Sequence, residues 1–239
     1  MDVLYIALMV PIASFAGTVA GFGTSSILVP YVSLFLPLPQ TLFLVGTIHW
    51  CGDIWQLMLF RQGVKWKLIL AFGLPGIVLS YVGARLTLVV NSATLLRILG
   101  GLLIAYVLVL AARPDLKLPR KDSVAVASGA TAGFTAGLFG ISGPVTGAFL
   151  SAYDLPKAVY IATAAAIALA LDTTRLTTYL VGGTRLDSNL AWGMVVFVPA
   201  SLIGALVAQR VVHRIPQGKY RAVVAIALLA FGVKLLLFP

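Results

Sequence analysis

Residues 17–37 read GTVAGFGTSSILVPYVSLFLP, and residues 136–156 read AGLFGISGPVTGAFLSAYDLP. In each stretch an apolar helical run stops at a Gly-rich break, a short apolar run follows, and a Leu-Pro pair ends it. The short runs, about 26–36 and 144–153, fall below the roughly 20 residues that a helix needs to cross a bilayer. We therefore expect two short broken half-helices.

Long apolar runs surround these two stretches. They lie at about 3–20, 40–60, 68–90, 95–112, 123–139, 157–181, 190–211 and 220–237. Charged residues are only 10% of the chain, against about a quarter in soluble domains. The runs lack the alternation of a β-barrel, and Asp2 stands where a cleavable signal carries basic residues. The expected fold is an all-α polytopic membrane protein with about eight long helical segments.

The chain is predicted to be a tandem duplication, because equivalent residues recur at one offset. Four matches are separated by 119 residues: Gly21 and Gly140, Leu36-Pro37 and Leu155-Pro156, Asp53 and Asp172, Gly63 and Gly182. After a longer connector, Pro75 and Pro199 match at 124 residues. The two transmembrane repeats are expected at 1–115 and 120–239, within a single membrane domain.

Basic residues indicate how the repeats are oriented. Eleven cations gather in the connectors 61–67, 113–121 and 210–221: Arg61, Lys65, Lys67, Arg113, Lys117, Arg120, Lys121, Arg210, Arg214, Lys219 and Arg221. Such connectors face the cytoplasm. Connector 61–67 would then lie inside and its repeat partner 182–189 outside, which makes the repeats inverted, as in secondary transporters. Both termini of this multi-pass protein of the cell (inner) membrane are expected outside the cytoplasm.

The Gly-rich breaks are the first candidate binding site. Non-helical backbone at membrane depth occurs only where it is buried in protein or lines a cavity. A helix that starts there presents free N–H donors and a positive dipole end, which favour an anion. The candidate substrate-binding residues are Gly21, Gly23, Thr24, Ser25, Ser26, Gly140, Ser142, Gly143 and Thr146. Alternatively, glycines such as Gly17, Gly21, Gly133 and Gly137 only let helices pack closely.

Ionisable residues inside membrane helices are the second candidate group. His49, Asp53 and Gln56 share one face of their helix, and the repeat partner of Asp53 is Asp172. Arg175 is predicted to donate paired hydrogen bonds to an anionic substrate, or else only to neutralise Asp172. His49, Asp53 and Asp172 are candidates for ion or proton coupling, and a hydrogen-bonded packing pair is the alternative for His49 and Asp53.

The whole pattern, a Gly-rich break, a short helix, a Leu-Pro junction and a polar helix, all occurring twice, resembles the sulfite exporter TauE/SafE family of membrane transporters. At the first break, Gly21-Phe22-Gly23-Thr24-Ser25 replaces the run of consecutive glycines that is typical of the family. The resemblance implies transport of sulfite, organosulfonates or related sulfur compounds, without a nucleotide-hydrolysing domain.

The chain is therefore expected to be a secondary transporter for a small sulfur-containing anion, working by alternating access, with proton coupling as one option. It is not expected to be an enzyme or to bind nucleic acid, a cofactor or a metal. Its expected partners are the anion and the lipid bilayer, and a homo-oligomer is compatible with the sequence. An anion channel is one alternative. The other is a rhomboid-like protease, since Gly140-Ile141-Ser142-Gly143 matches the G-x-S-G around the rhomboid nucleophile; yet the downstream histidine, His213, lies in a connector.

Overall fold

The computed structural model describes residues 2–20, 23–60, 63–113, 118–211 and 217–239. These residues form ten helices and no strand, which confirms the all-α prediction. The helices are α1 (Asp2–Ala20), α2 (Ser25–Val32), α3 (Leu38–Leu59), α4 (Trp66–Thr87), α5 (Ser92–Ala112), α6 (Asp122–Phe139), α7 (Gly143–Ser151), α8 (Lys157–Val181), α9 (Ser188–Val211) and α10 (Gln217–Leu237). Eight are long, and the two short ones, α2 and α7, follow the Gly-rich breaks.

The helices carry the surface of a membrane protein. Within the described ranges, five helices, α3, α4, α5, α8 and α9, are long and apolar enough to cross a bilayer, and α1 and α10 contain shorter apolar stretches. Large apolar side chains such as Val78, Val195 and Ile226 are more than half exposed on the outside. Lipid tails solvate such a surface, so the polytopic membrane fold is confirmed.

The short helices fold back along the helices that precede them. Tyr5, near the start of α1, stacks on Phe35, just beyond α2, with ring centroids 6.3 Å apart. In the second half, Arg120, just before α6, donates a hydrogen bond to the carbonyl of Ala152 and pairs with Asp154, both just beyond α7. Each half therefore opens with a helical hairpin, α1–α2 or α6–α7, whose turn is the Gly-rich break.

Helix α2 ends at Val32, earlier than the predicted 36. Residues 33–36 continue as turns with hydrogen bonds such as Phe35 N–H to Val32 O, at 3.0 Å. Pro37 disfavours helical backbone at Leu36, the residue before it, so the helix cannot continue from this segment into α3.

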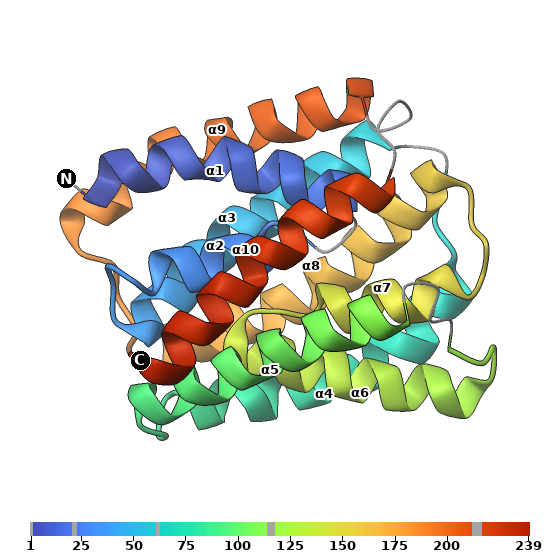
Figure 1. Ribbon diagram of the computed structural model, residues 1–239, viewed down its shortest axis with the longest axis horizontal. Coiled ribbons are helices and arrows are strands. Elements are labelled where there is room, and N and C mark those ends of the chain that lie inside the picture. Colours follow the sequence, from blue (N-terminus) through green and yellow to red (C-terminus); the bar gives the residue numbers. More distant parts are fainter. Residues whose placement is uncertain (1, 21–22, 61–62, 114–117, 212–216) are drawn as a thin grey trace.

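Each long helix of the first half packs against a long helix of the second half, and equivalent long helices form equivalent pairs. Helix α1 packs on α9 as α6 packs on α4, while α3 pairs with α8 and α5 with α10. Corresponding helices run in opposite directions, and the three cation-rich junctions α3–α4, α5–α6 and α9–α10 lie at the end of the molecule opposite both termini (Figure 1). This arrangement is the one that inverted repeats predict. Of the predicted cations, Arg61, Lys117 and Arg214 lie outside the described residues.

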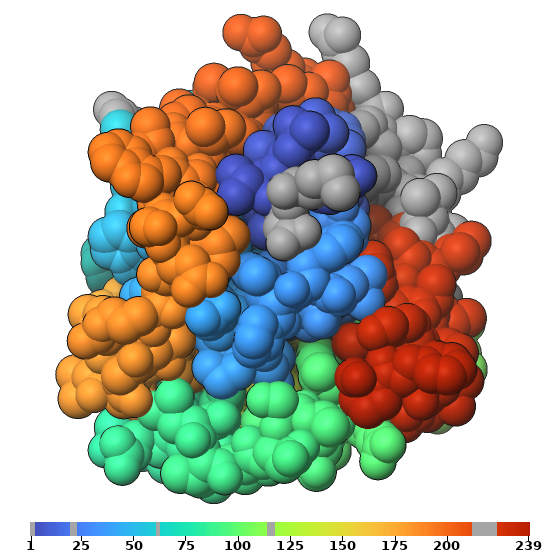
Figure 2. Space-filling model, turned by 90° about the vertical axis from the view of Figure 1, so that its left-hand side faces the viewer, coloured from blue at the N-terminus to red at the C-terminus, as the bar shows by residue number. Residues whose placement is uncertain are grey.

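The end that carries the termini is filled at its centre by the first hairpin. Figure 2 shows α2 and the segment that follows it, in blue, between α9 in orange and α10 in red, and above the α4–α5 junction in green. The short helix α2 and its connection to α3 therefore close this end of the protein.

Close contact between α6 and α4 depends on glycines, as the packing alternative for these residues predicted. A Cβ added at Gly133 would lie 2.0 Å from the carbonyl oxygen of Gly76, and one at Gly137 would lie 2.1 Å from that of Ser80. Backbone atoms cannot move aside as the end of a flexible side chain can. These glycines therefore set the distance between the two helices. Gly17 instead approaches the backbone of Gly23 and Thr24 within the first hairpin, and Gly21 lies outside the described residues.

Gly133→Ala is therefore expected to lower the free energy of unfolding by about 1–3 kcal/mol, as overpacked cores do. Gly101→Ala is the matched control, because an added Cβ there meets nothing within 4 Å. The control should be neutral or slightly stabilising, since alanine favours a helix interior over glycine. Chemical unfolding in detergent measures both, and an equal loss in the two variants would contradict glycine-dependent packing.

Candidate functional site

Helices α3 and α8 cross at the centre of the molecule and carry the buried charges. On α3, His49, Asp53 and Gln56 are spaced by four and three residues and so share one face, as predicted. On α8, Asp172 and Arg175 are three residues apart. All five side chains are at least nine-tenths buried. Helix spacing and the α3–α8 contact thus gather these residues in one place.

Asp172 is the centre of the cluster. One carboxylate oxygen lies 2.7 Å from His49 Nδ1, and the other accepts a hydrogen bond of 2.7 Å from Arg175 Nε. Asp53 also lies beside the ring, with Oδ2 3.4 Å from His49 Nδ1. Because the carboxylate takes the Nδ1 side of the imidazole, the ring is oriented with Nε2 on the opposite side.

His49 Nε2 points toward the first hairpin turn. A Cβ added at Gly23 would lie 2.7 Å from this nitrogen, and Gly23 has a φ of +76°, which glycine adopts without strain. Nε2 is buried and has no hydrogen-bond partner among the described residues. The imidazole therefore presents an unused polar atom beside the turn.

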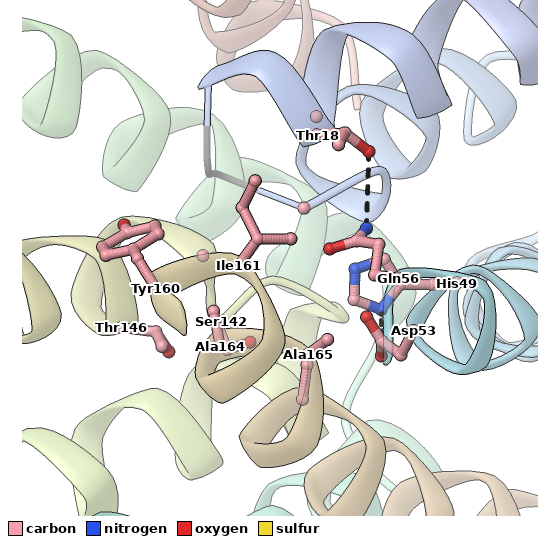
Figure 3. A pocket seen from close by; sticks show the side chains of 14 residues that line it. Thr18, His49, Asp53, Gln56, Ser142, Thr146, Tyr160, Ile161, Ala164 and Ala165 are labelled. Carbon is pink, nitrogen blue, oxygen red and sulfur yellow. Dashed lines mark hydrogen bonds and ion pairs between the residues drawn. The ribbon is translucent and has the colours of Figure 1, made fainter. Parts of the chain in front are cut away.

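A small cavity of about 40 Å³ lies next to these groups. His49, Asp53 and Gln56 line it from α3, and Ser142, Gly143 and Thr146 line it from the second hairpin turn and the start of α7. Figure 3 shows the three α3 side chains extending toward α8 and the turn that carries Ser142. Gly17, Thr18 and Gly23 add the first hairpin. The two Gly-rich breaks, far apart in sequence, thus meet at one cavity.

The second turn is shaped to present a helix start to this cavity. Gly140 ends α6 in the left-handed conformation, with a φ of +71°, and its N–H bonds the carbonyl of Ala136 at 2.8 Å. Ser142 then precedes α7, and Pro144 fits its first turn. The hydroxyl of Thr146 is buried without a partner in the described part of the chain. The free N–H donors of α7 and this hydroxyl favour an anionic ligand.

The other predicted residues lie farther from the cavity. Thr24, Ser25 and Ser26 are buried at the start of α2 but do not line it, nor does Gly140. Gly21 lies outside the described residues. Gln56, whose amide donates to Thr18 Oγ1 at 3.4 Å, does line the cavity but was not among the predicted binding residues.

Helix α8 forms one wall of the cavity, and this wall was not predicted from the sequence. Its lining residues are Tyr160, Ile161, Ala164, Ala165 and Ala168. Their three- and four-residue spacing places them on one face, and this periodicity was the available signal. Small residues at that spacing are also typical of simple helix packing in membranes, so the pattern alone did not indicate a cavity.

Arg175 does not line the cavity. Its side chain is completely buried, and Nη1 donates to the backbone carbonyl of Leu42 at 3.3 Å while Nε bonds Asp172. Only Nη2 has no partner in the described ranges. The predicted contact between Arg175 and the anion therefore gains no support from the geometry, which favours the alternative of an internal pair with Asp172.

The cluster is neutral when it holds one additional proton, on His49 or on a carboxylate such as Asp53. Two carboxylates and one guanidinium leave one negative charge when the imidazole is neutral. One imidazole nitrogen of His49 and one carboxylate oxygen each of Asp53 and Asp172 lie within 4.8 Å of one another, and such atoms can ligate a metal. However, both oxygens of Asp172 already bond His49 and Arg175, and the guanidinium would repel a cation. A proton fits this cluster better than a metal ion does.

Arg175→Gln is expected to strand the Asp172 carboxylate and destabilise the protein by about 3–5 kcal/mol, as breaking a buried pair does. If Arg175 only neutralises Asp172, adding Asp172→Asn should restore folding and anion binding together. Unfolding in detergent and anion binding to the refolded variants measure the two effects. A double mutant that folds normally but has lost the anion would instead assign the ligand contact to Arg175.

Comparison with known proteins covers nearly the whole chain. The family model described as sulfite exporter TauE/SafE matches residues 6–235, a range that includes both hairpins and all of the buried cluster. None of the curated proteins compared with the chain matches it significantly. The match confirms the resemblance seen in the two Gly-rich breaks, and it places the chain among membrane transporters rather than enzymes. The chain belongs to the sulfite exporter TauE/SafE family.

Proposed function

We propose that this protein is a secondary transporter that binds a small sulfur-containing anion, sulfite or a small organosulfonate, in the cavity between the two hairpin turns. The observation that carries the proposal is the meeting of both turns with His49 and Asp53 at one buried cavity. In inverted-repeat transporters, the substrate site lies between the repeats near the middle of the bilayer, where broken helices present their ends to the ligand. The family to which the chain belongs is consistent with this substrate class.

We further propose that the anion moves together with a proton carried by His49 or Asp53. No Lys or Arg lines the described cavity, so a bound anion adds a negative charge beside the Asp53 carboxylate. Uncompensated charge in a buried site is costly. Taking up one proton for each anion keeps the net charge of the site unchanged during transport.

The cation-rich end of the molecule is assigned to the cytoplasm, and both termini to the opposite side of the cell membrane, by the positive-inside rule. Lys65, Lys67 and Lys121 belong to that end. Labelling of Lys121→Cys only from the outer side, in a Cys51→Ser background, would reverse the assignment.

A channel is less well supported than a carrier, because the two hairpins pack differently. Helix α2 contacts α10, where Tyr31 and Phe231 meet edge to face at 6.5 Å. The equivalent helices α7 and α5 are separated by an apolar groove of about 280 Å³, and α7 instead packs toward α4 through Phe149 and Phe72, at 5.0 Å. Exchange of these two arrangements between the halves would produce the opposite-facing state of an alternating-access carrier.

The protease alternative is not supported by the site. Ser142 and His49 do line the same cavity, a pairing that a search for a downstream histidine could not find. However, His49 Nε2 accepts no hydrogen bond from Ser142 or from any other described residue, so the serine lacks the contact that activates a nucleophile. His213 lies outside the described residues. The family match points to transport.

Purified protein in liposomes should accumulate sulfite when an inward proton gradient is imposed, and His49→Gln should reduce this accumulation at least about tenfold, as loss of a positioned proton carrier does. Trp50→Phe is the matched control, since it removes only the Trp50–Thr173 hydrogen bond of 2.9 Å on the same two helices. Gradient-driven accumulation that is unchanged in His49→Gln would refute His49 as the proton carrier, and sulfite accumulation that does not depend on the proton gradient would refute proton coupling. Absence of flux for sulfite and every small sulfonate would refute the proposed substrate class.

A bulky side chain placed in the α5–α7 groove should block transport without abolishing anion binding. Both Val109 and its neighbour Leu108 are exposed on α5, but only Val109 lines the groove. Val109→Trp is expected to reduce flux severalfold while anion binding in detergent is retained, and Leu108→Trp should leave both unchanged. Equal flux in the two variants would mean that α7 does not move toward α5.

A further inference from the structure

Asp53 is the one acidic side chain that lines the described cavity. It is 2% exposed, and its Oδ2 accepts no hydrogen bond from the described residues. The nearest charged group, His49 Nδ1, lies 3.4 Å away but is already bonded to Asp172 at 2.7 Å. A buried carboxylate oxygen without a donor is rare in proteins, because its desolvation is not compensated.

The groups around Asp53 do not supply the missing donor. From α3, the amide of Gln56 donates to Thr18. From α8, Ala165 lies beside Asp53 and offers no polar side chain, whereas Tyr160 lies at the far side of the cavity (Figure 3). The hydroxyls of Ser142 and Thr146 lie on the second hairpin, and Thr146 Oγ1 has no partner within the described residues.

The cavity thus has two unlike sides. Hydroxyls, the start of α7 and, when the imidazole is protonated, His49 Nε2 can donate to the oxygens of an anion, while Asp53 can only accept when it is ionised. A fully deprotonated anion would set oxygen lone pairs against the carboxylate, whereas an anion with a hydroxyl group would donate a hydrogen bond to it. A cavity of about 40 Å³ holds only a few water-sized groups.

We propose that Asp53 is a specificity-determining residue that selects singly charged oxyanions carrying their own hydrogen-bond donor, such as hydrogen sulfite or a hydroxyalkanesulfonate. The inference rests on the proposed anion site and adds to it the chemistry that Asp53 recognises. Dianions and sulfonates with a wholly apolar tail are discriminated against, because they leave Asp53 Oδ2 without a hydrogen-bond donor.

Two anions of equal charge and heavy-atom number test this selection: hydroxymethanesulfonate, which carries a hydroxyl donor, and ethanesulfonate, which carries a methyl group in its place. Binding to the intact protein in detergent is measured by calorimetry at one pH. Wild type should prefer hydroxymethanesulfonate by about tenfold or more, since a site built to bond a hydroxyl rejects the analogue that lacks it. Asp53→Leu should reduce the preference to near unity, and Asp53→Asn, which keeps an acceptor oxygen, should retain part of it.

The outcomes separate this proposal from the proposed function. Equal affinity of the wild type for both sulfonates would overturn the role of Asp53 and leave the anion site standing, even if neither variant folds. A preference that survives in a folded Asp53→Leu would also overturn it. Failure of the wild type to bind either sulfonate or hydrogen sulfite would instead refute the anion site itself.

Discussion

Hydrocarbon offers no hydrogen bonds to a peptide group, and the site of this protein depends on that constraint. A helix can break inside a bilayer only where protein surrounds the freed N–H and C=O groups. The break after α6 meets this condition, because Gly140 and Ile141 return their N–H groups to the carbonyls of Ala136 and Thr135. Gly23 of the first break and Ser142 and Gly143 of the second line a cavity whose other walls come from α3 and α8. The polar backbone that binding would use is therefore also backbone that protein must surround.

The buried charged residues fix the position of the His49 imidazole beside the cavity. Asp172 joins α3 to α8 by bonding His49 on one side and Arg175 on the other, and the same contact points His49 Nε2 at the first turn. Asp53 and Thr146 face the cavity from opposite sides. Arg175 does not line the cavity, but its positive charge and its hydrogen bond hold the Asp172 carboxylate in place. Asp172 and Arg175 thus determine how His49 is presented to the cavity.

Local patterns in the sequence were sufficient to predict the helix breaks and part of the candidate site. Glycine and proline mark breaks through their own backbone preferences, so both short helices were located, and the four- and three-residue spacing placed His49, Asp53 and Gln56 on one face. The fold-back of α2 and α7 was not predictable, because it depends on contacts such as Tyr5 with Phe35 and Arg120 with Asp154. The direction of Arg175 likewise depends on the distant carbonyl of Leu42. The alanines of α8 carried no distinguishing signal, since a cavity wall and a packing surface use the same residues.

A structure of the protein with a selenium-containing oxyanion bound, located by its anomalous scattering, tests most directly whether the two hairpin turns form one anion site. Selenite is close in shape and charge to sulfite, and its selenium marks the position of the ion independently of any assumption about the site. If the two turns form one anion site, one selenium position is expected in the central cavity, with the oxygens of the ion within hydrogen-bond distance of His49 Nε2 and Thr146 Oγ1. Selenium bound only at the cation-rich end of the molecule, with the central cavity empty at saturating selenite, would contradict it.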